Sequence, residues 1–260
     1  MGDQGNPCWY ELNAPDLDTA GAFYGQVFGW QVMESGMAGF DYRLARAGEA
    51  MVAGMMAQAD APPRWLIYFA VDDCDRMAQA ITAAGGGLRQ PPADIPGTGR
   101  YGVATDPQGV EFGILQPDMS RMSAEDIARA EASAPFDQDK PGHGQWNELM
   151  STDPVAGFAF YSGLFGWTRG EAMPMGAMGS YQLFRHKGRD IGAMTGLGAA
   201  PGPLWLPYFG AAMPMGKLAE VIAAAGGTVR HGPVEVPGPA WILVACDPQG
   251  AAFAAVGAEK

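Results

Sequence analysis

The sequence predicts an α+β fold in which one domain is present twice in tandem. Three observations predict it: a length of 260 residues, a repeated set of motifs, and a helical and strand-like hydrophobic pattern that alternates within each repeat. Chains near this length usually contain one large or two small domains. Because 48% of the residues are hydrophobic and 17% are charged, the chain has enough apolar material for a core in each repeat.

Four motifs occur twice in the same order. The distance between the two copies changes only from 137 residues at the first motif (146 − 9) to 141 at the last (247 − 106). Order and spacing kept over the whole chain indicate a tandem duplication. We therefore predict a first domain at residues 1–118, a linker with a short helix at 119–141 and a second domain at 142–260. The motifs, first copy and then second, are WYE (9–11) and WNE (146–148), AFYGQVFGW (22–30) and AFYSGLFGW (159–167), WLIYF (65–69) and WLPYF (205–209), and DPQG (106–109) and DPQG (247–250).

Within each repeat the hydrophobic pattern changes from strand to helix and back. In the first repeat, residues 8–13 alternate as a short strand, and Asp16 can cap a helix that Gly29 ends. An almost entirely apolar strand covers residues 65–71, and Asp73 can cap a second helix after it. Each repeat is therefore predicted to contain a strand, a helix and further strands, twice over. The further strand-like runs of the first repeat lie at residues 40–45, 51–56, near 88, at 101–104 and at 110–115.

Composition and charge exclude several classes of function. Lys and Arg total 16 against 28 Asp and Glu, which gives a net charge of −12, and no basic run is present. An acidic chain repels phosphate groups, so we expect no nucleic acid partner and no membrane partner. The longest apolar run, residues 65–71, is too short to cross a bilayer. Cys8, Cys74 and Cys246 are odd in number and widely spaced, which favours a reducing, cytoplasmic location over a disulfide framework.

The pattern D-L-x-x-A-x-x-F-Y-x-x-x-F-G at residues 16–29, followed by D-P-x-G at 106–109, resembles the glyoxalase/bleomycin-resistance/extradiol-dioxygenase group, the vicinal oxygen chelate superfamily. The resemblance covers nearly the whole chain, twice. It implies that each domain consists of two paired βαβββ modules, whose U-shaped mixed sheet forms a groove for a small ligand. Four modules in one chain resemble the two-domain extradiol dioxygenases, or a glyoxalase dimer fused end to end.

The resemblance also implies a divalent metal, bound by His and carboxylate side chains at fixed places. In this chain Trp, Leu, Gly and Ala stand at those places, and such side chains cannot coordinate a cation of this kind. We therefore predict no metal site and no other cofactor, and the reactions of the family are not carried over. The places correspond to Trp9 and Trp146, Leu66 and Leu206, Gly113 and Ala254, and the segments 51–57 and 191–197, which contain no His, Asp or Glu.

Glu11 and Glu148 are the main candidates for chemistry. Strand alternation places each on the same face as the tryptophan two residues before it. In a groove, such a carboxylate could act as a general base or accept hydrogen bonds from a ligand. The alternative is architectural: a salt bridge, or backbone hydrogen bonds that hold two modules together. Because the motif recurs in both repeats, the architectural interpretation is favoured.

Other candidates carry weaker signals. Glu111 has no counterpart, since Ala252 stands at its place in the second repeat; it is either a second groove carboxylate or a lone exposed glutamate. Tyr68 and Tyr208 could offer a phenol to a ligand or be tyrosines at the edge of the core. The three histidines, His143, His186 and His231, are interpreted as surface or loop residues.

Taken together, the residues predict a small-molecule-binding protein of the glyoxalase/bleomycin-resistance type that lacks the usual metal ligands, with an apolar or weakly cationic ligand. The alternative is a lyase or dioxygenase-type enzyme of the same superfamily, which would use relocated metal ligands or a groove glutamate as general base. Whether the protein is an enzyme stays open at this point, and the catalytic candidates are Glu11, Glu111 and Glu148. We expect an internal domain pair that is a monomer or a weak homodimer. The predicted groove residues are Trp9, Glu11, Tyr68, Glu111, Gly113, Trp146, Glu148 and Tyr208.

Overall fold

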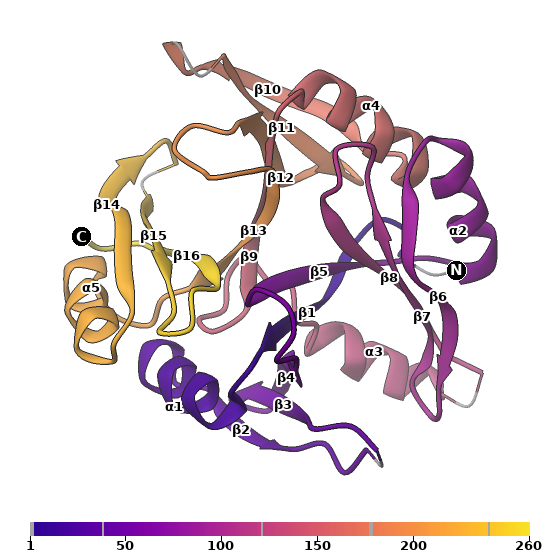
Figure 1. Cartoon of the computed structure of the whole chain (residues 1–260), viewed down its shortest axis with the longest axis horizontal. Coiled ribbons are helices and arrows are strands. Elements are labelled where there is room, and N and C mark those ends of the chain that lie inside the picture. Colours follow the sequence, from indigo (N-terminus) through magenta and orange to yellow (C-terminus); the bar gives the residue numbers. More distant parts are fainter. Residues whose placement is uncertain (1–2, 38, 121, 177–178, 239) are drawn as a thin grey trace. The chain divides into compact units, whose positions relative to one another are not determined.

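The computed structural model of the chain (Figure 1) describes residues 3–37, 39–120, 122–176, 179–238 and 240–260. The first repeat contains β1 (Pro7–Ala14), α1 (Leu17–Phe28), β2 (Gln31–Glu34), β3 (Tyr42–Ala47), β4 (Ala50–Ala57), β5 (Arg64–Ala70), α2 (Cys74–Ala83), β6 (Gly87–Ile95), β7 (Gly99–Thr105) and β8 (Glu111–Pro117). Helix α3 (Ala124–Ala132) follows. The second repeat contains β9 (Gly144–Ser151), α4 (Pro154–Phe165), β10 (Thr168–Pro174), β11 (Ser180–His186), β12 (Arg189–Gly196), β13 (Leu204–Gly210), α5 (Met215–Ala224), β14 (Thr228–Val236), β15 (Ala240–Cys246) and β16 (Ala252–Gly257).

The strands form two eight-stranded mixed sheets with the same order. The first is β2-β3-β4-β1-β5-β8-β7-β6, and the second is β10-β11-β12-β9-β13-β16-β15-β14. In each module the first strand pairs in parallel with the last, as β1 does with β4 and β5 with β8, and the other pairs are antiparallel. A parallel pair needs a crossover, which the helix after the first strand begins. The predicted α+β fold with tandem βαβββ modules is confirmed.

The helix boundaries follow the capping signals of the sequence. Asp16 accepts hydrogen bonds from the backbone N–H groups of Asp18 (2.9 Å) and Thr19 (3.1 Å), which have no partner inside the helix. Gly29 ends α1 with a left-handed φ of 71°, a conformation that glycine adopts without strain. In the second repeat Gly166 ends α4 with a φ of 70°, so the repeated Phe-Gly-Trp motif is a helix terminator.

Three strands differ from the expectation. Strands β2 and β10 are not predicted from the sequence, because their residues are mostly exposed or half-buried and carry no clear alternation. Strand β6 was expected only as a short run near Leu88, but it extends over nine residues. It contains Pro91 and Pro92, which weaken a strand signal. Prolines are tolerated here because β6 is an edge strand and donates fewer backbone hydrogen bonds.

The contacts divide the chain into two compact units that do not coincide with the repeats. Each unit contains one module from each repeat: α2 packs beside α4 in unit 1, and α1 packs beside α5 in unit 2 (Figure 1). The domain boundaries predicted above describe the sequence repeats and stay a prediction. Unit 1 consists of Met1–Cys8, Ile67–Ala130 and Asn147–Trp205, and unit 2 consists of Trp9–Leu66, Glu131–Trp146 and Leu206–Lys260.

A chain of three buried side chains joins the two repeats inside unit 2. The indole Nε1 of Trp65 donates to the hydroxyl of Tyr24 (2.9 Å), and that hydroxyl donates to Oδ2 of Asp247 (3.2 Å). The other carboxylate oxygen of Asp247 accepts backbone N–H groups of the DPQG turn, Gln249 (2.9 Å) and Gly250 (2.8 Å) among them. Burial raises the pKa of this carboxyl above its usual value.

Unit 1 repeats this arrangement with the roles of the repeats exchanged. Trp205 donates to Tyr161 (3.0 Å), which donates to Asp106 (3.2 Å). Burial raises the pKa of Asp106 as well. The recurring WL, FY and DPQG motifs are therefore parts of one buried network, and a buried network must be fully hydrogen-bonded to be stable. Six phenylalanines of the repeated motifs and their neighbouring strands are buried in the core: Phe23, Phe28, Phe112, Phe160, Phe165 and Phe253.

Each DPQG turn also holds the helix cap of the other repeat through its glutamine. In unit 2 the amide of Gln249 accepts from the backbone N–H of Asp16 (2.9 Å) and donates to its carbonyl (2.8 Å). In unit 1 Gln108 accepts from the N–H of Asp153 (3.1 Å) and donates to its carbonyl (3.2 Å). Within the described part of the chain, no helix is long and apolar enough to span a membrane.

Candidate functional site

Glu11 lies in a row of hydrogen-bonded side chains in unit 2, which we call the Glu11 cluster (Trp9, Glu11, Asn13 and Tyr42). The indole Nε1 of Trp9 donates to the Tyr42 hydroxyl (3.0 Å), and this hydroxyl donates to Oε2 of Glu11 (3.1 Å). The amide of Asn13 donates to Oε1 of Glu11 at 3.4 Å. Glu11 is only 8% exposed, and a carboxylate so buried needs such donors.

A glycine makes room for this cluster. Gly54 on β4 stands opposite Glu11 in the parallel β1–β4 register, and Tyr42 lies on β3 next to β4. A Cβ atom on Gly54 would overlap the phenol of Tyr42. The absence of a side chain at Gly54 therefore lets Tyr42 reach across β4 to Glu11.

Unit 1 contains a related pair, which we call the Glu148 pair (Glu148 and Tyr181). The Tyr181 hydroxyl on β11 donates to Oε2 of Glu148 on β9 at 2.7 Å, and Glu148 is 5% exposed. Sequence reasoning selected both glutamates but missed Tyr42 and Tyr181. A tyrosine that recurs at an offset of 139 residues (181 − 42), close to that of the glutamates, is the signal that could have found them.

Glu111 lies at the start of β8 in unit 1 and is neither fully buried nor fully exposed. Its Oε1 is 3.4 Å from Nε of Arg89, and its side chain is 22% exposed against 65% for Arg89. A partly exposed ion pair of this kind contributes little to stability. Glu111 is therefore a paired surface carboxylate of β8, and its predicted role in a groove stays a prediction.

Tyr68 and Tyr208 are both 4% exposed. Tyr68 on β5 stands opposite Gly113 on β8 in unit 1, and Tyr208 on β13 stands opposite Ala254 on β16 in unit 2. A Cβ atom on Gly113 would overlap the Tyr68 ring. The Tyr68 ring therefore occupies the space that a glutamate side chain at position 113, as in the vicinal oxygen chelate family, would need. Trp146, on β9, is half-buried.

The side chains at the family's metal places do not fit a divalent cation. Trp9, Leu66 and Gly113, like their counterparts in the second repeat, offer no oxygen or nitrogen donor. At Gly113 the Tyr68 ring also leaves no room for a longer side chain. Within the described residues, no group of three or more His, Cys, Asp or Glu side chains could hold a metal ion.

The histidines and cysteines lie outside the Glu11 cluster and the Glu148 pair. His143 lies in the loop before β9, in agreement with the prediction of a surface or loop residue, and it is buried, with 3% exposed. His186 contacts the carboxylate of Asp3, and His231 is exposed on β14. Burial raises the pKa of the Cys74 thiol to about 11 and that of Cys8 further, so both thiols stay protonated at neutral pH. Neither is a nucleophile under ordinary conditions.

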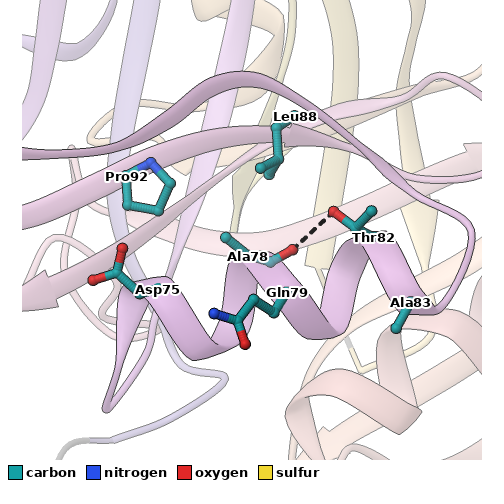
Figure 2. Close-up of a pocket in the computed structure, with 7 residues that line it drawn as sticks. All are labelled: Asp75, Ala78, Gln79, Thr82, Ala83, Leu88 and Pro92. Carbon is teal, nitrogen blue, oxygen red and sulfur yellow. Dashed lines mark hydrogen bonds between the residues drawn. The ribbon is translucent and has the colours of Figure 1, made fainter.

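A hollow of about 540 Å³ lies between α2 and β6 in unit 1 (Figure 2). Two of its three polar side chains, Thr82 and Asp75, are already engaged, and the third is Gln79. The Thr82 hydroxyl bonds the carbonyl of Ala78 (3.0 Å), and Asp75 forms an ion pair with Arg100 (2.9 Å). None of the predicted groove residues lines it, so it is not the candidate site. The lining residues are Asp75, Ala78, Gln79, Thr82, Ala83, Leu88 and Pro92.

Comparisons with known proteins identify the family and the fold of the chain. The profile of the Glyoxalase/Bleomycin resistance protein/Dioxygenase superfamily matches residues 8–114. A protein of Mycobacterium bovis named "Putative glyoxylase CFP32" is 30% identical over 263 residues, which cover 96% of this chain and 94% of the relative. The "Anthracycline biosynthesis protein DnrV" of Streptomyces peucetius is 27% identical over 274 residues, 97% of this chain and 93% of the relative. The Mn(II)-bound glyoxalase from Novosphingobium aromaticivorans has the same fold, with a TM-score of 0.66 at 16% identity over 100% of this chain and 84% of that one.

Proposed function

Because the chain belongs to the glyoxalase/bleomycin resistance protein/dioxygenase superfamily, we propose that it is a small-molecule-binding protein that works without the divalent metal of that family. The observation that carries the proposal is the buried glutamate–tyrosine pair found once in each repeat. Each glutamate lies two residues after the tryptophan that occupies a metal-ligand place, Trp9 or Trp146. A polar group thus remains next to the place where the family binds its metal.

The chemistry of the pair indicates the class of ligand. A buried carboxylate that is fixed by a phenol can accept a hydrogen bond from an ammonium or hydroxyl group. Indole and phenol rings beside it offer flat apolar surfaces for an aromatic ligand. The net charge of −12 attracts cations rather than phosphates. We therefore propose an aromatic, weakly cationic ligand, a class to which the name of the relative DnrV also points.

The proposal includes the setting in which the protein works. We propose a cytoplasmic protein that is a monomer or a weak homodimer, with a small molecule as its partner and with no nucleic acid or membrane partner. The acidic composition supports the last point, because phosphate groups are repelled. The carboxylates of Glu11 and Glu148 and the phenols of Tyr42 and Tyr181 are the proposed contacts.

A fluorescence titration with an anthracycline tests the proposal. Binding next to Trp9 is expected to quench tryptophan emission and to saturate. Glu11→Gln and Glu148→Gln remove the negative charge at the two pairs, and each is expected to weaken binding at its own site about tenfold, or ~1.4 kcal/mol. Glu220→Gln, the same change on an exposed residue of α5, is the matched control. A titration without quenching, or one unchanged in both variants, contradicts this ligand class.

A dialysis experiment tests the metal-free part of the proposal. The purified chain is stripped with a chelator and dialysed against Mn²⁺, and bound manganese is measured by atomic absorption. We expect no stoichiometric manganese, because the side chains at the family's metal places have no donor atoms. One tightly bound Mn²⁺ per repeat would contradict the proposal whatever the fluorescence result.

A second candidate function rests on the contact between Tyr181 and Glu148. The Tyr181 hydroxyl donates to Glu148 at 2.7 Å, which fixes the carboxylate. Glu148 could then take a proton from a carbon acid, exchange it with solvent and return a solvent proton to the carbanion. The protein would then be a metal-free lyase or isomerase. Deuterium uptake from D₂O into the anthracycline probe, measured by mass spectrometry, would support this function if Glu148→Gln abolished it. Binding without uptake favours the non-catalytic function.

A further inference from the structure

A second cavity lies in unit 2, away from the Glu11 cluster. It has a volume of about 400 Å³ and lies between the β3–β4 turn (residues 47–50), the end of α3 (132–133), and residues 140–143 just before β9. Its walls are mostly apolar, with Ala47, Ala50 and Pro141 among them. Its polar side chains are those of Glu49, Ser133, Lys140 and His143.

The matching place in unit 1 is identified by a tryptophan contact present in both units. Trp30 donates to the carbonyl of Gly142 in unit 2, and Trp167 donates to the carbonyl of Gly5 in unit 1, both at 2.8 Å. Both glycines have a positive φ, 76° and 89°. Counting back two residues from each glycine, Lys140 of unit 2 corresponds to Asp3 of unit 1.

In unit 1 charged side chains occupy this place. His186 Nε2 is 3.0 Å from the carboxylate of Asp3, and Lys187 also forms an ion pair with Asp3. His186 is the last residue of β11, and Lys187 is the first residue of the β11–β12 turn, which corresponds to the β3–β4 turn of unit 2.

In unit 2 the corresponding residues are Ala47, the last residue of β3, and Gly48, the first residue of the turn. Gly48 (φ 58°) and Lys187 (φ 47°) share the left-handed conformation, so the two turns begin alike. They differ at the next residue, because Gly188 (φ 82°) is left-handed and Glu49 is not. Alanine and glycine have no side chain long enough to fill the space. The cavity therefore exists because the two turn side chains present in unit 1 are missing in unit 2.

His143 presents an unused acceptor in this cavity. Its Nδ1 is 2.8 Å from the carbonyl of Ala134, which can only accept, so Nδ1 carries the hydrogen and Nε2 carries a lone pair. Nε2 has no hydrogen-bond partner among the described residues, although the side chain is only 3% exposed. Burial lowers the pKa of His143, which keeps the ring neutral at neutral pH.

Lys140 offers a donor in the same cavity. Two of its three N–H groups are engaged, with the carbonyl of Ala132 (2.7 Å) and with the carboxylate of Asp137 (2.8 Å). The third has no partner in the described part of the chain. Because Asp137 balances the charge of Lys140 and Glu49 lies at the rim, the cavity gives no net attraction to an anion.

We propose that this cavity binds a small neutral molecule with two adjacent hydroxyl groups. One hydroxyl oxygen accepts from Lys140 Nζ, and the neighbouring hydroxyl donates to His143 Nε2. The carbon skeleton lies against the alanine and proline walls. This site is separate from the glutamate–tyrosine pairs and does not depend on their function.

The His143 ring signals in an NMR titration of the full chain test the proposal. With 1,2-propanediol we expect a saturable shift of these signals; with 1-propanol, which lacks the second hydroxyl, we expect a shift at least fivefold weaker at equal concentration. Lys140→Met removes the donor but leaves His143 in place, and it should reduce the diol affinity to that of 1-propanol.

A transplant variant provides the decisive control. Ala47→His, Gly48→Lys and Lys140→Asp together place the Asp3, His186 and Lys187 set of unit 1 into unit 2 and fill the cavity. The variant should keep its melting temperature and lose the diol shift. No saturable shift in the original chain, an equal shift with 1-propanol, tighter binding of lactate than of the diol, or a shift retained in the folded transplant variant would overturn the proposal.

Discussion

Unit 1 and unit 2 share the contacts at their centres and differ where small molecules could bind. The Trp–Tyr–Asp network, the glutamine on the helix cap and the tryptophan on the glycine carbonyl occur in both units with nearly equal distances. The contacts of Asp3 with His186 and Lys187 in unit 1 have no equivalent at the cavity of unit 2, where Ala47 and Gly48 stand at the places of His186 and Lys187. The duplicated chain has thus kept the interactions that hold the fold and varied those around its cavities.

The largest effect is expected from the buried aspartates, which should respond alike in both units. Asp106→Ala and Asp247→Ala each leave a tyrosine hydroxyl and several turn N–H groups without an acceptor, which costs about 3 kcal/mol. Urea unfolding of each variant measures the loss. A difference between the two variants of more than about 1 kcal/mol would break the equivalence of the two networks. Asp→Asn at the same positions keeps one acceptor oxygen and should lose less.

The next effect distinguishes the two units. Gly113→Ala forces a Cβ atom into the Tyr68 ring of unit 1 and should lower the free energy of unfolding by about 2 kcal/mol through overpacking. The matching position in unit 2 already carries Ala254 opposite Tyr208, so Ala254→Gly should cost only about 0.5–1 kcal/mol. Thermal unfolding of both variants checks the order. Equal losses would mean that the two tyrosines are packed alike.

The glutamines of the DPQG turns should give a smaller difference. Gln108 accepts from the Ser151 hydroxyl and from the backbone N–H of Thr152 (both 2.9 Å) in addition to its two bonds with Asp153. Gln249 bonds the N–H and the carbonyl of Asp16. Gln108→Ala is therefore expected to cost about 2 kcal/mol and Gln249→Ala about 1 kcal/mol in denaturant unfolding. The reverse order would contradict the bond count.

The smallest effect concerns pH and residue His143. Burial lowers its pKa below the value of about 6.5 of an exposed imidazole, so the folded state favours the neutral ring. The neutral His143 ring contributes fully to stability above the unfolded-state pKa. This contribution is lost as the pH falls through the lower folded-state pKa. His143→Asn introduces the residue that unit 1 carries at the matching position, Asn6. Its free energy of unfolding should therefore fall less than that of the original chain when the pH is lowered from 7.5 to 5. If the free energies of unfolding of the two proteins changed with pH in parallel, the protonation of His143 would not be coupled to unfolding.

Local signals predicted much of the fold. Asp16 and Gly29 marked both ends of a helix because capping depends on residues close in sequence. Alternation predicted the first strand of the repeat, and a continuous apolar run predicted the strand at residues 65–71. By contrast, the compact units could not be predicted, because a repeat pattern shows that modules are alike and does not show which of them pack together.

The candidate site was predicted only in part for a similar reason. Glu11 was found from its place next to Trp9 on one strand. Its partner Tyr42 comes from another strand, and the contact depends on Gly54 between them. Hydrogen bonds across strands require the register, which motif spacing alone does not supply. The burial of His143 in its loop does not follow from the sequence, because it depends on the contact of Nδ1 with the carbonyl of Ala134.

The composition of the units has a consequence for how this gene can change. Tyr24 and Asp247 meet in one unit, and Tyr161 and Asp106 meet in the other, so each half of the coding sequence supplies one member of both partnerships. A premature stop at the midpoint would damage both units rather than delete one. Substitutions in one half therefore affect partners encoded in the other half. The loss of the Tyr24 hydroxyl is best compensated by a change at Asp247, more than two hundred codons downstream.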